Sequence, residues 1–471
     1  MIEHKQIFID GRWVDSSGTD VLTVINPATE EAFATIPYGS ADDVHRAAQA
    51  AANAFPGWSN SPVQQRADIF RKLARLTEAR SDEITRTIVT ELGYPITAAA
   101  KSQTAGGVEE LDLIAESLAE IQWVLQFGST HVRRVPSGVV GAITAWNAPL
   151  RSIISKAGAA MAAGCTVVLK PSEVAPLTAF MFAEMCAEAG LPSGVFNLVC
   201  GTGPEVGEAI ASHPLVDMVS LTGSVRAGRR VMELASASIK RVHLELGGKS
   251  PNIIFADADL ERAVVDGIED AMRNTGQVCG GLTRMLVPRQ RLQEAGALAA
   301  RRAQAYVLGD PFDPKTTLGP VATAAARERV RGYIRSGLED GAQMLTGGPD
   351  APDGLSRGYY VRPTIFTGDN TSRIAREEIF GPVVVIIPFE NEADAIRIAN
   401  DTPYGLAAGV WARDAEHARA VATKLRAGRV RINGAPLDKR GVHGGFKLSG
   451  VGREWGRLGI EEFLEYQSVM G

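Results

Sequence analysis

Between residues 137 and 246, short apolar segments alternate regularly with segments of helical pattern. Strands are predicted at "GVVGAITAW" (138–146), "TVVLK" (166–170), "VFNLV" (195–199), "VDMVSLT" (216–222) and "RVHLEL" (241–246), with helices over 149–163, 179–189, 204–212 and 224–234. This alternation is typical of βαβ units, which build a parallel sheet covered by helices on both faces. Ligands of such sheets bind beyond the carboxyl ends of the strands. The candidate site positions are therefore the loops that begin at Asn147, Pro171, Gly201 and Gly223.

The segments on either side of this region extend the α/β pattern. Asp10-Gly11 lies between two short β-prone runs and predicts a tight hairpin turn. Helices are expected over 41–55, 63–79, 82–93 and 103–126, and a second mixed α/β region runs from 250 to 446. No internal repeat or low-complexity linker separates the regions, so we expect domains that pack together.

Composition excludes several classes of protein. The 471 residues carry a formal net charge of −5 with no long block of either sign, so neither nucleic acid nor an anionic membrane surface is an expected partner. No window approaches the ~18 uninterrupted apolar residues that a membrane span needs. The N-terminal "MIEHKQIFIDGRWV" has neither the apolar core of a signal peptide nor a transit-peptide pattern. A cytoplasmic protein is expected.

The four cysteines differ in their surroundings. Cys165, Cys186 and Cys200 lie in apolar segments, where cysteine serves as a small buried hydrophobe. The cysteines form no close pair and do not cluster with histidine, which argues against a zinc site and against a disulfide framework. Cys279 lies in "GQVCGG", whose small residues let a substrate approach the sulfur. A nucleophile is one interpretation, although a free thiol titrates near ~8.5 and then needs a base. A cysteine protease with a distant histidine is the alternative.

Glu245 is a second candidate. Strand alternation places His243 and Glu245 on one face of the predicted strand, with Glu245 at its end just before Gly247-Gly248. A carboxylate in this position can reach into a cleft. The structural alternative is a glutamate at the sheet edge paired with Arg241, and the presence of Cys279 favours the functional interpretation.

Several strings, taken in order, carry a family resemblance. "LELGGKSP" and "GQVC" are joined by "WNAPL", "LKPSE", "LTGS", "EEIFGPV", "NDTPYGLAAGVW" and "GGFKLSGVGRE". Over essentially its whole length the chain resembles the NAD(P)-dependent aldehyde dehydrogenase superfamily. The resemblance implies a Rossmann-type cofactor domain (1–117 and 137–247), an α/β catalytic domain (248–446) and a small β oligomerisation element (118–136 and 447–471). A homodimer or homotetramer is then expected.

The same resemblance assigns a reaction and its residues. Cys279 would add to the aldehyde, and after oxidation the thioester would be cleaved by water with Glu245 as general base. The side-chain amide of Asn147 and the backbone amide of Cys279 would stabilise the tetrahedral oxyanion. For Asn147 the structural alternative is a helix N-cap ahead of Pro149.

The resemblance also assigns a cofactor site without a metal. Its residues would be Trp146, Lys170, Glu173, Gly223, Ser224, Glu378 and Phe380. Glycines between strand and helix in "GTGPEVG" and "GSVRAG" suit a pyrophosphate. Glu173 would bind the ribose 2′-hydroxyl and repel a 2′-phosphate, so NAD is favoured and NADP is the second option.

Other positions and functions stay open. Lys156 and Glu454 align with residues of a family proton relay, while a solvated lysine and a surface glutamate explain them equally well. His443 stands where phenylalanine is usual, and a surface histidine is favoured over one that meets a polar substrate. A CoA-acylating semialdehyde dehydrogenase is the enzymatic alternative, and a non-catalytic binding protein on this fold is the alternative outside enzymes.

Overall fold

The parallel strands predicted from the sequence form the centre of an eight-stranded sheet. The computed structural model describes residues 1–471, and the sheet has the order β20-β12-β11-β8-β9-β10-β2-β3. The strands are β20 (Gly450–Val451), β12 (Arg241–Glu245), β11 (Met218–Thr222), β8 (Val139–Ile143), β9 (Thr166–Lys170), β10 (Phe196–Leu198), β2 (Gln6–Ile9) and β3 (Arg12–Asp15). The five from β8 to β12 pair only in parallel with one another, which confirms the prediction.

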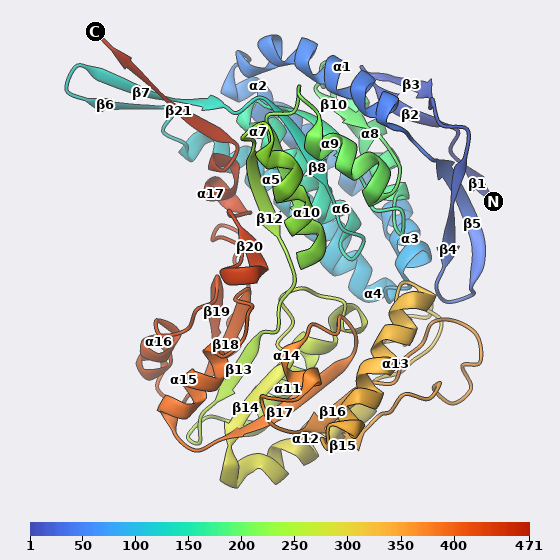
Figure 1. The fold of residues 1–471 in the computed structure, drawn as a ribbon, viewed down its shortest axis with the longest axis vertical. Coiled ribbons are helices and arrows are strands. Elements are labelled where there is room, and N and C mark those ends of the chain that lie inside the picture. Colours follow the sequence, from blue (N-terminus) through green and yellow to red (C-terminus); the bar gives the residue numbers. More distant parts are fainter.

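Helices cover both faces of this sheet because its strands alternate apolar residues between two cores. Val167 and Leu169 of β9 enter one core and Val168 enters the other. The helices of this lobe, at the top of Figure 1, are α1 (Ala41–Ser59), α2 (Val63–Ala79), α3 (Ser81–Leu92), α4 (Ile96–Ala99), α5 (Gly106–Glu120), α6 (Pro149–Ile153), α7 (Ala159–Ala163), α8 (Leu177–Ala189), α9 (Glu208–Ser212), α10 (Val225–Ser236) and α17 (Gly456–Glu461). Short π-helical turns precede α5, α7 and α9.

The N-terminal residues form the predicted hairpin and a separate small sheet. Asp10 and Gly11 both have positive φ (54° and 73°), the backbone that a tight hairpin turn requires. They join β2 to β3, which pair in antiparallel fashion. The separate three-stranded sheet consists of β1 (Ile2–Glu3), β5 (Glu31–Pro37) and β4 (Val21–Asn26).

A seven-stranded sheet forms the second lobe, at the bottom of Figure 1. Its order is β15 (Gln343–Thr346), β16 (Thr364–Thr367), β17 (Val383–Phe389), β14 (Arg284–Pro288), β13 (Pro251–Ile254), β18 (Ala407–Trp411) and β19 (Arg429–Ile432). All neighbours are parallel except β15 and β16. Its helices are α11 (Leu260–Met272), α12 (Leu292–Gln304), α13 (Ala324–Glu339), α14 (Arg373–Arg376), α15 (Glu392–Asn400) and α16 (Ala415–Ala422).

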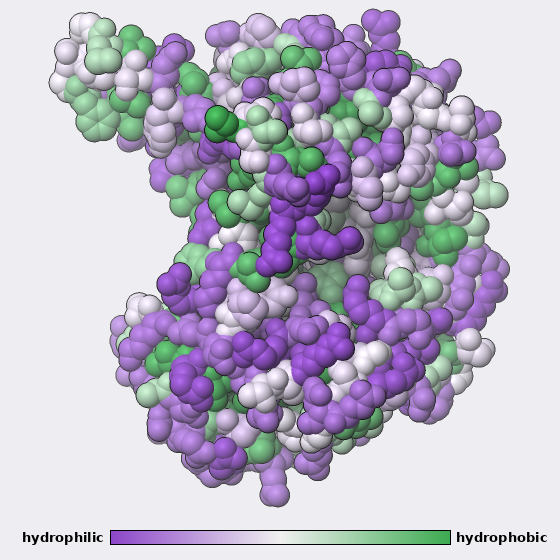
Figure 2. Space-filling model, viewed as in Figure 1, coloured by the Kyte–Doolittle hydropathy of each residue, from purple (hydrophilic) through white to green (hydrophobic).

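The chain passes between the two lobes twice. It leaves the first after β12, which ends at Glu245, and enters the second at β13, which begins at Pro251. It returns between β19 and β20, and β20 pairs with β12. Figure 1 shows these two crossings on the same side of the molecule, and Figure 2 shows a hollow between the lobes beside them.

A three-stranded arm extends from the first lobe. It contains β21 (Leu464–Met470), β7 (Thr130–Pro136) and β6 (Val124–Phe127), all antiparallel. The helix predicted over 103–126 is therefore wrong at its end: α5 stops at Glu120, and the following residues pair with β7. The expected segment 447–471 also divides, because its early part supplies β20 and α17 to the first lobe and only β21 joins the arm.

The arm exposes large apolar side chains. Phe127 and Tyr466 are each 64% exposed and Met470 is 77% exposed. Hydrophobic patches on the arm are visible at the upper left of Figure 2. Elsewhere, none of the helices has the length and apolar character needed to span a lipid bilayer.

Candidate active site

The loop after α11 presents Cys279 from a constrained backbone. Thr275 and Gly276 both have positive φ (56° and 73°), which is unusual for a β-branched residue such as Thr275. The Thr275 hydroxyl donates to the carbonyl of Gly319 at 3.0 Å and holds this conformation. A Cβ at Gly276 would overlap the backbone of Gly381, so only glycine fits there. The loop is thus fixed from two sides before it reaches the cysteine.

Cys279 differs from the other cysteines in exposure and surroundings. It is half-buried, whereas the other three are buried, and all four are free thiols. Burial raises the pKa of Cys279 to about 11, the carboxyl of Glu245 adds to the rise, and Arg429 opposes it. The resting group is therefore a neutral thiol, which needs a base to become a nucleophile.

Asn147 follows β8 and contacts the cysteine loop. Its Nδ2 donates to the carbonyl of Gln277 at 3.0 Å, and Nδ2 of Asn274 donates back to the carbonyl of Asn147 at 3.2 Å. The N-cap residue of α6 is Ala148, and no side chain caps that helix. The helix-cap interpretation of Asn147 is therefore wrong, because its amide is turned towards the cysteine loop.

Glu245 is buried at the end of β12. It is 2% exposed, and neither carboxylate oxygen has a hydrogen-bond partner. Burial raises the pKa of Glu245 well above its ordinary value, and the nearby Glu454 adds to the rise. Arg241 pairs instead with Glu465 at 3.1 Å, so the sheet-edge interpretation of Glu245 is wrong. Glu245 is therefore a buried carboxyl group that binds its proton more tightly than a solvent-exposed glutamate does.

The glycine pair after β12 brings the two lobes into contact. A Cβ at Gly248 would lie 2.6 Å from the carbonyl oxygen of Cys279, and one at Gly247 would overlap the carboxylate of Glu378. The Gly248 amide donates to Oε1 of Glu378 at 3.1 Å, and burial raises the pKa of that carboxyl to about 7. Gly247-Gly248 therefore allow the cysteine loop and Glu378 to pack against the segment that follows Glu245.

The predicted cofactor residues lie at two places, at strand ends of the first lobe and just before β17 of the second. Trp146 follows β8, Lys170 ends β9, and Gly223-Ser224 follow β11, so these residues lie at the carboxyl ends of parallel neighbours. Lys170 Nζ contacts Glu173 Oε2 at 3.1 Å. The other partner of Lys170 Nζ is the carbonyl of Pro171, so this pair is not hydrogen-bonded to Cys279 or Glu245.

The other two predicted cofactor residues come from the second lobe. Glu378 and Phe380 precede β17, and the Phe380 ring packs edge-on against the Trp146 ring with centroids 5.4 Å apart. This contact joins the end of β8 to the segment before β17. The backbone amide of Gly223 donates to the carbonyl of Glu245 at 3.0 Å, so the loop after β11 is fixed directly to the strand of the candidate base.

Lys156 and Glu454 form a buried ion pair. Lys156 Nζ lies 2.7 Å from Glu454 Oε1, with 0% and 7% of the two side chains exposed. Lys156 also donates to Oγ of Ser220 at 3.3 Å. The interpretations of a solvated lysine and a surface glutamate are wrong, because the packing of α17 and the preceding turn against the first lobe buries both groups.

His443 is also buried, so the prediction of a surface histidine at this position is wrong. It is 7% exposed, and its Nε2 lies 3.3 Å from Oε2 of Glu245. Its backbone exchanges two hydrogen bonds with Glu454, at 2.9 and 2.7 Å. Its ring stacks on Trp455 with centroids 4.7 Å apart. The only sequence feature that could have indicated a role for His443 in the site is the replacement of the usual phenylalanine by histidine.

Sequence reasoning missed Arg429 entirely. This residue begins β19, and its Nη1 donates to Nδ1 of His443 at 3.2 Å. A Cβ at Gly280 would overlap its guanidinium, so the arginine lies against the residue that follows Cys279. It has no carboxylate partner within 4.0 Å among the ion pairs of the structure. An arginine in a strand of alternating pattern carries no signal of such a position.

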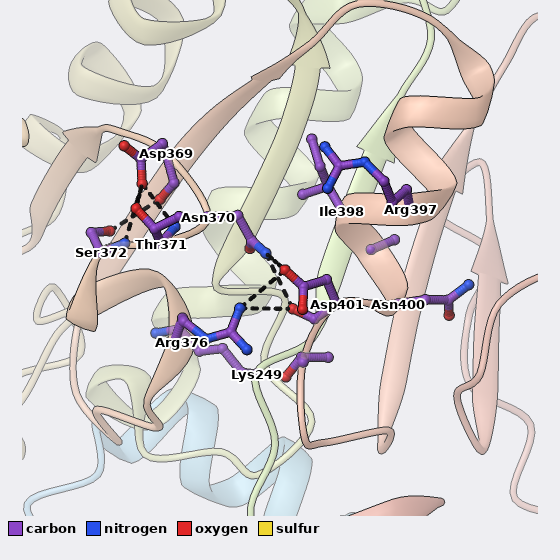
Figure 3. Close-up of polar contacts among 12 residues, drawn as sticks. Lys249, Asp369, Asn370, Thr371, Ser372, Arg376, Arg397, Ile398, Asn400 and Asp401 are labelled. Carbon is purple, nitrogen blue, oxygen red and sulfur yellow. Dashed lines mark hydrogen bonds and ion pairs between the residues drawn. The ribbon is translucent and has the colours of Figure 1, made fainter.

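A polar cluster fixes the turn after α15 beside this region. Asp401 accepts hydrogen bonds from Nδ2 of Asn370 at 2.9 Å and from Nη1 of Arg376 at 3.1 Å (Figure 3). The buried Arg284 donates to the carbonyl of Lys249 at 2.9 Å. Burial and Arg284 lower the pKa of Lys249 to about 7, so a lysine that titrates near neutral pH follows the Gly247-Gly248 pair.

Comparison with known proteins decides the family. The model of the aldehyde dehydrogenase family matches residues 13–469. The chain belongs to the aldehyde dehydrogenase family. This agrees with the order of motifs in the sequence and with a cysteine, a buried glutamate and an asparagine gathered between two α/β lobes.

Individual aldehyde dehydrogenases are similar over their whole length. The 3-succinoylsemialdehyde-pyridine dehydrogenase of Pseudomonas sp is 47% identical over 473 residues, which cover 100% of this chain and 99% of that protein. A mutant of aldehyde dehydrogenase C from Pseudomonas syringae, solved with NAD+ and octanal, is 46% identical with a TM-score of 0.98, covering 99% of this chain and 96% of that one. An aldehyde dehydrogenase of Mycobacterium tuberculosis, solved with NAD+, is 40% identical with a TM-score of 0.97, covering 100% and 98%.

Proposed function

We propose that this aldehyde dehydrogenase oxidises an aldehyde to a carboxylic acid with NAD, through a thiohemiacetal and a thioester on Cys279. The observation that carries the proposal is the meeting of three separate segments at the junction of the lobes. Asn147 is hydrogen-bonded to the loop of Cys279, and Glu245 is close enough to raise the pKa of that thiol. Such a set supplies a nucleophile, an oxyanion donor and a base.

The predicted cofactor residues fit a dinucleotide. Gly203 has open space where a Cβ would stand, and Ser224 is exposed at the N-terminus of α10, where backbone amides favour a phosphate. Glu378 has a carboxylate oxygen free for a ribose hydroxyl, with Phe380 and Trp146 beside it. When bound, NAD accepts the two electrons and the hydrogen that leave the substrate carbon. The NAD+ in the similar structures of P. syringae and M. tuberculosis proteins supports this choice.

The chain's own residues perform the addition step. The thiol of Cys279 loses its proton to a nearby base and its sulfur bonds to the aldehyde carbon, while the carbonyl oxygen becomes an oxyanion. Asn147 Nδ2 and the Cys279 amide donate to that oxygen, a type of contact typically worth ~3 to 4 kcal/mol. Asn147 is already turned towards the cysteine loop, so little reorganisation is required.

Hydrolysis of the thioester is assigned to Glu245. Its carboxylate takes a proton from water, the hydroxide oxygen bonds to the acyl carbon, and the Cys279 sulfur leaves. Because burial raises the pKa of Glu245 above its ordinary value, its carboxylate is a stronger base than that of a solvent-exposed glutamate. A buried glutamate favours water over CoA as the acyl acceptor, and an assay for acyl-CoA tests the alternative.

The choice between NAD and NADP is assigned to Glu173. Its carboxylate lies 3.1 Å from Lys170 Nζ at the end of β9 and is 40% exposed, so it remains accessible to a ribose. A carboxylate accepts from a 2′-hydroxyl and repels a 2′-phosphate. NAD is therefore the preferred cofactor and NADP the poorer one.

We also propose that the arm joins two copies of the chain. Its strands β21 and β6 are sheet edges, and Phe127, Tyr466 and Met470 expose apolar surface on it. Pairing along these edges would produce a homodimer, or a homotetramer from two dimers. The four free thiols support a reducing compartment such as the cytoplasm.

The test is turnover by the purified protein. A panel of aldehydes that differ in length, charge and aromaticity is assayed with NAD and with NADP, and the acid product is identified. We expect reduction of NAD with at least one aldehyde and none with Cys279→Ala. Failure of the wild-type protein across the panel, with folding and NAD binding intact, would favour a non-catalytic binding protein.

A further inference from the structure

His443 lies between an arginine and the candidate base. Arg429 Nη1 is 3.2 Å from His443 Nδ1, and His443 Nε2 is 3.3 Å from Oε2 of Glu245. The three side chains come from separate segments, because Arg429 begins β19, Glu245 ends β12, and His443 lies in the loop between β19 and β20. Neither oxygen of the Glu245 carboxylate has a hydrogen-bond partner, and among lysine, arginine and histidine nitrogens only Nε2 of His443 lies within 4.0 Å of it.

The arginine fixes the tautomer of the imidazole. A guanidinium has donors and no acceptor, so Nδ1 of His443 must accept and carries no hydrogen. The proton of the neutral ring is then on Nε2, which faces the carboxylate. The contact is not a hydrogen bond in this structure, but the positive end of an N–H on Nε2 lies beside Oε2 and favours the ionised form of Glu245 over the carboxylic acid.

The surroundings keep this arrangement in one protonation state. Burial and Arg429 lower the pKa of His443 to about 3, with Arg151 and Lys156 acting in the same direction and Glu454 opposing them. The ring is therefore neutral over the physiological range. Glu245 faces the same neighbours: Glu454 raises its pKa, and Lys156, Arg453 and Arg429 lower it.

We propose that His443 is a positioning residue for Glu245, which holds the base as an oriented carboxylate through an Nε2–H group whose direction Arg429 sets. The proposal rests on the proposed role of Glu245 in hydrolysis. The proposal gives a role to a position where this chain has histidine in place of the usual phenylalanine. This role is separate from that of the Lys156–Glu454 ion pair, which contacts His443 only through the backbone of Glu454.

The test compares two substitutions of His443 with different chemistry. His443→Phe keeps an aromatic ring against Trp455 and removes the donor, whereas His443→Gln keeps a donor and an acceptor. For His443→Phe we expect the acid limb of the kcat profile to move about one unit to higher pH, because the polar N–H group beside the charged form of Glu245 is lost. We also expect a burst of NADH, since deacylation becomes slower. For His443→Gln we expect the acid limb of the kcat profile to lie closer to its wild-type pH than in His443→Phe.

Arg429→Gln provides an independent test of the proposal. If the arginine acts partly through the imidazole, its substitution moves the same limb in the same direction, and the shift in the double variant falls short of the sum of the two single shifts. The charge of Arg429 also lowers the pKa of Glu245 directly, which accounts for the part of the shift that remains additive. An unchanged limb in His443→Phe, or fully additive effects in the double variant, would overturn the proposal. So would a His443→Gln profile no nearer to wild type than that of His443→Phe.

Glu245→Gln separates failure of this proposal from failure of the proposed function. Loss of the acid limb in Glu245→Gln, together with an unmoved limb in His443→Phe, refutes only the role of His443. Retention of the limb in Glu245→Gln refutes the base assignment and, with it, the inference built on it.

Discussion

Asn147 and Gln277 are joined across the two lobes by a hydrogen bond of 3.0 Å from the side-chain amide to the backbone carbonyl. Asn274, three residues before Gln277, donates back to the carbonyl of Asn147 at 3.2 Å. The end of β8 and the loop of Cys279 are therefore fixed to each other by two contacts. The proposed oxyanion donor and the proposed nucleophile take their relative position from this connection.

Asn147→Ala is expected to lower kcat by roughly 100- to 1,000-fold, the usual effect of removing one oxyanion donor. Asn274→Ala is the matched control, because it removes the second contact between the same segments and leaves the amide donor in place. Its loss of kcat should be much smaller. Equal losses in steady-state assays of the two variants would mean that Asn147 acts by holding the loop.

Cys279→Ala should abolish dehydrogenase turnover and leave NAD binding unchanged, since the sulfur is the only group proposed to bond to the aldehyde. Fluorescence titration with NAD and steady-state assays measure the two effects. Cys186→Ala, in the buried face of α8, is the control and should retain activity. Turnover at the wild-type rate by Cys279→Ala would remove the nucleophile assignment.

Glu245→Gln should slow thioester hydrolysis while still allowing acylation once a thiolate forms. Because the amide cannot take a proton from water, an acyl-enzyme with the mass of the substrate acyl group is expected on Cys279. Intact-protein mass spectrometry after mixing with aldehyde and NAD checks this. Rapid turnover without accumulation would count against Glu245 as the base.

Glu173→Gln should narrow the preference for NAD over NADP, mainly through a lower KM for NADP, because it removes a negative charge next to the 2′-phosphate. Glu188→Gln, on the exposed side of α8, is the matched control and should leave the preference unchanged. The ratio of kcat/KM for the two cofactors is the measurement. An identical ratio in wild type and Glu173→Gln would remove this role.

Glu91 gives a prediction for stability. Burial raises its pKa from 4.5 to about 8, and its Oε1 accepts from the amide of Leu177 at 2.6 Å. The folded protein holds a proton that the unfolded chain releases, so the stabilisation present below pH 4.5 is lost as the pH rises to about 8. Glu91→Gln should lose less stability over this interval, as measured by denaturant unfolding. Equal pH dependence in both proteins would show that Glu91 does not titrate this way.

Much of the fold could be predicted from local pattern. The strands β8 to β12 are predicted by short apolar runs between helical segments. The dipeptide Asp10-Gly11 predicts the hairpin turn. The end of the helix predicted over 103–126 could not be placed, because residues from Val124 onwards become a strand only by pairing with β7. Edge pairing of this kind depends on tertiary partners that a local pattern does not contain.

The site was predictable where a motif carried it. Cys279, Glu245 and Asn147 follow from strand ends, glycines and family strings. Lys156 and His443 could not be placed by the same means, because their burial results from the return of the chain after β19 and from the packing of Glu454 against the first lobe. No sequence feature indicated that Arg429 lies in the candidate site, since its neighbours Gly280 and His443 are distant in sequence.

Both covalent connections between the lobes leave the first lobe from one pair of neighbouring strands, β12 and β20, at the edge of its sheet. Glu245 is opposite Gly450 in that pair, so the backbone of the proposed base is held by a strand pairing at the place where the chain leaves and returns. The contacts of Asn147 with the loop of Cys279 join the lobes without a covalent bond. A displacement of the lobes that broke these contacts would therefore leave the strand pairing of Glu245 intact.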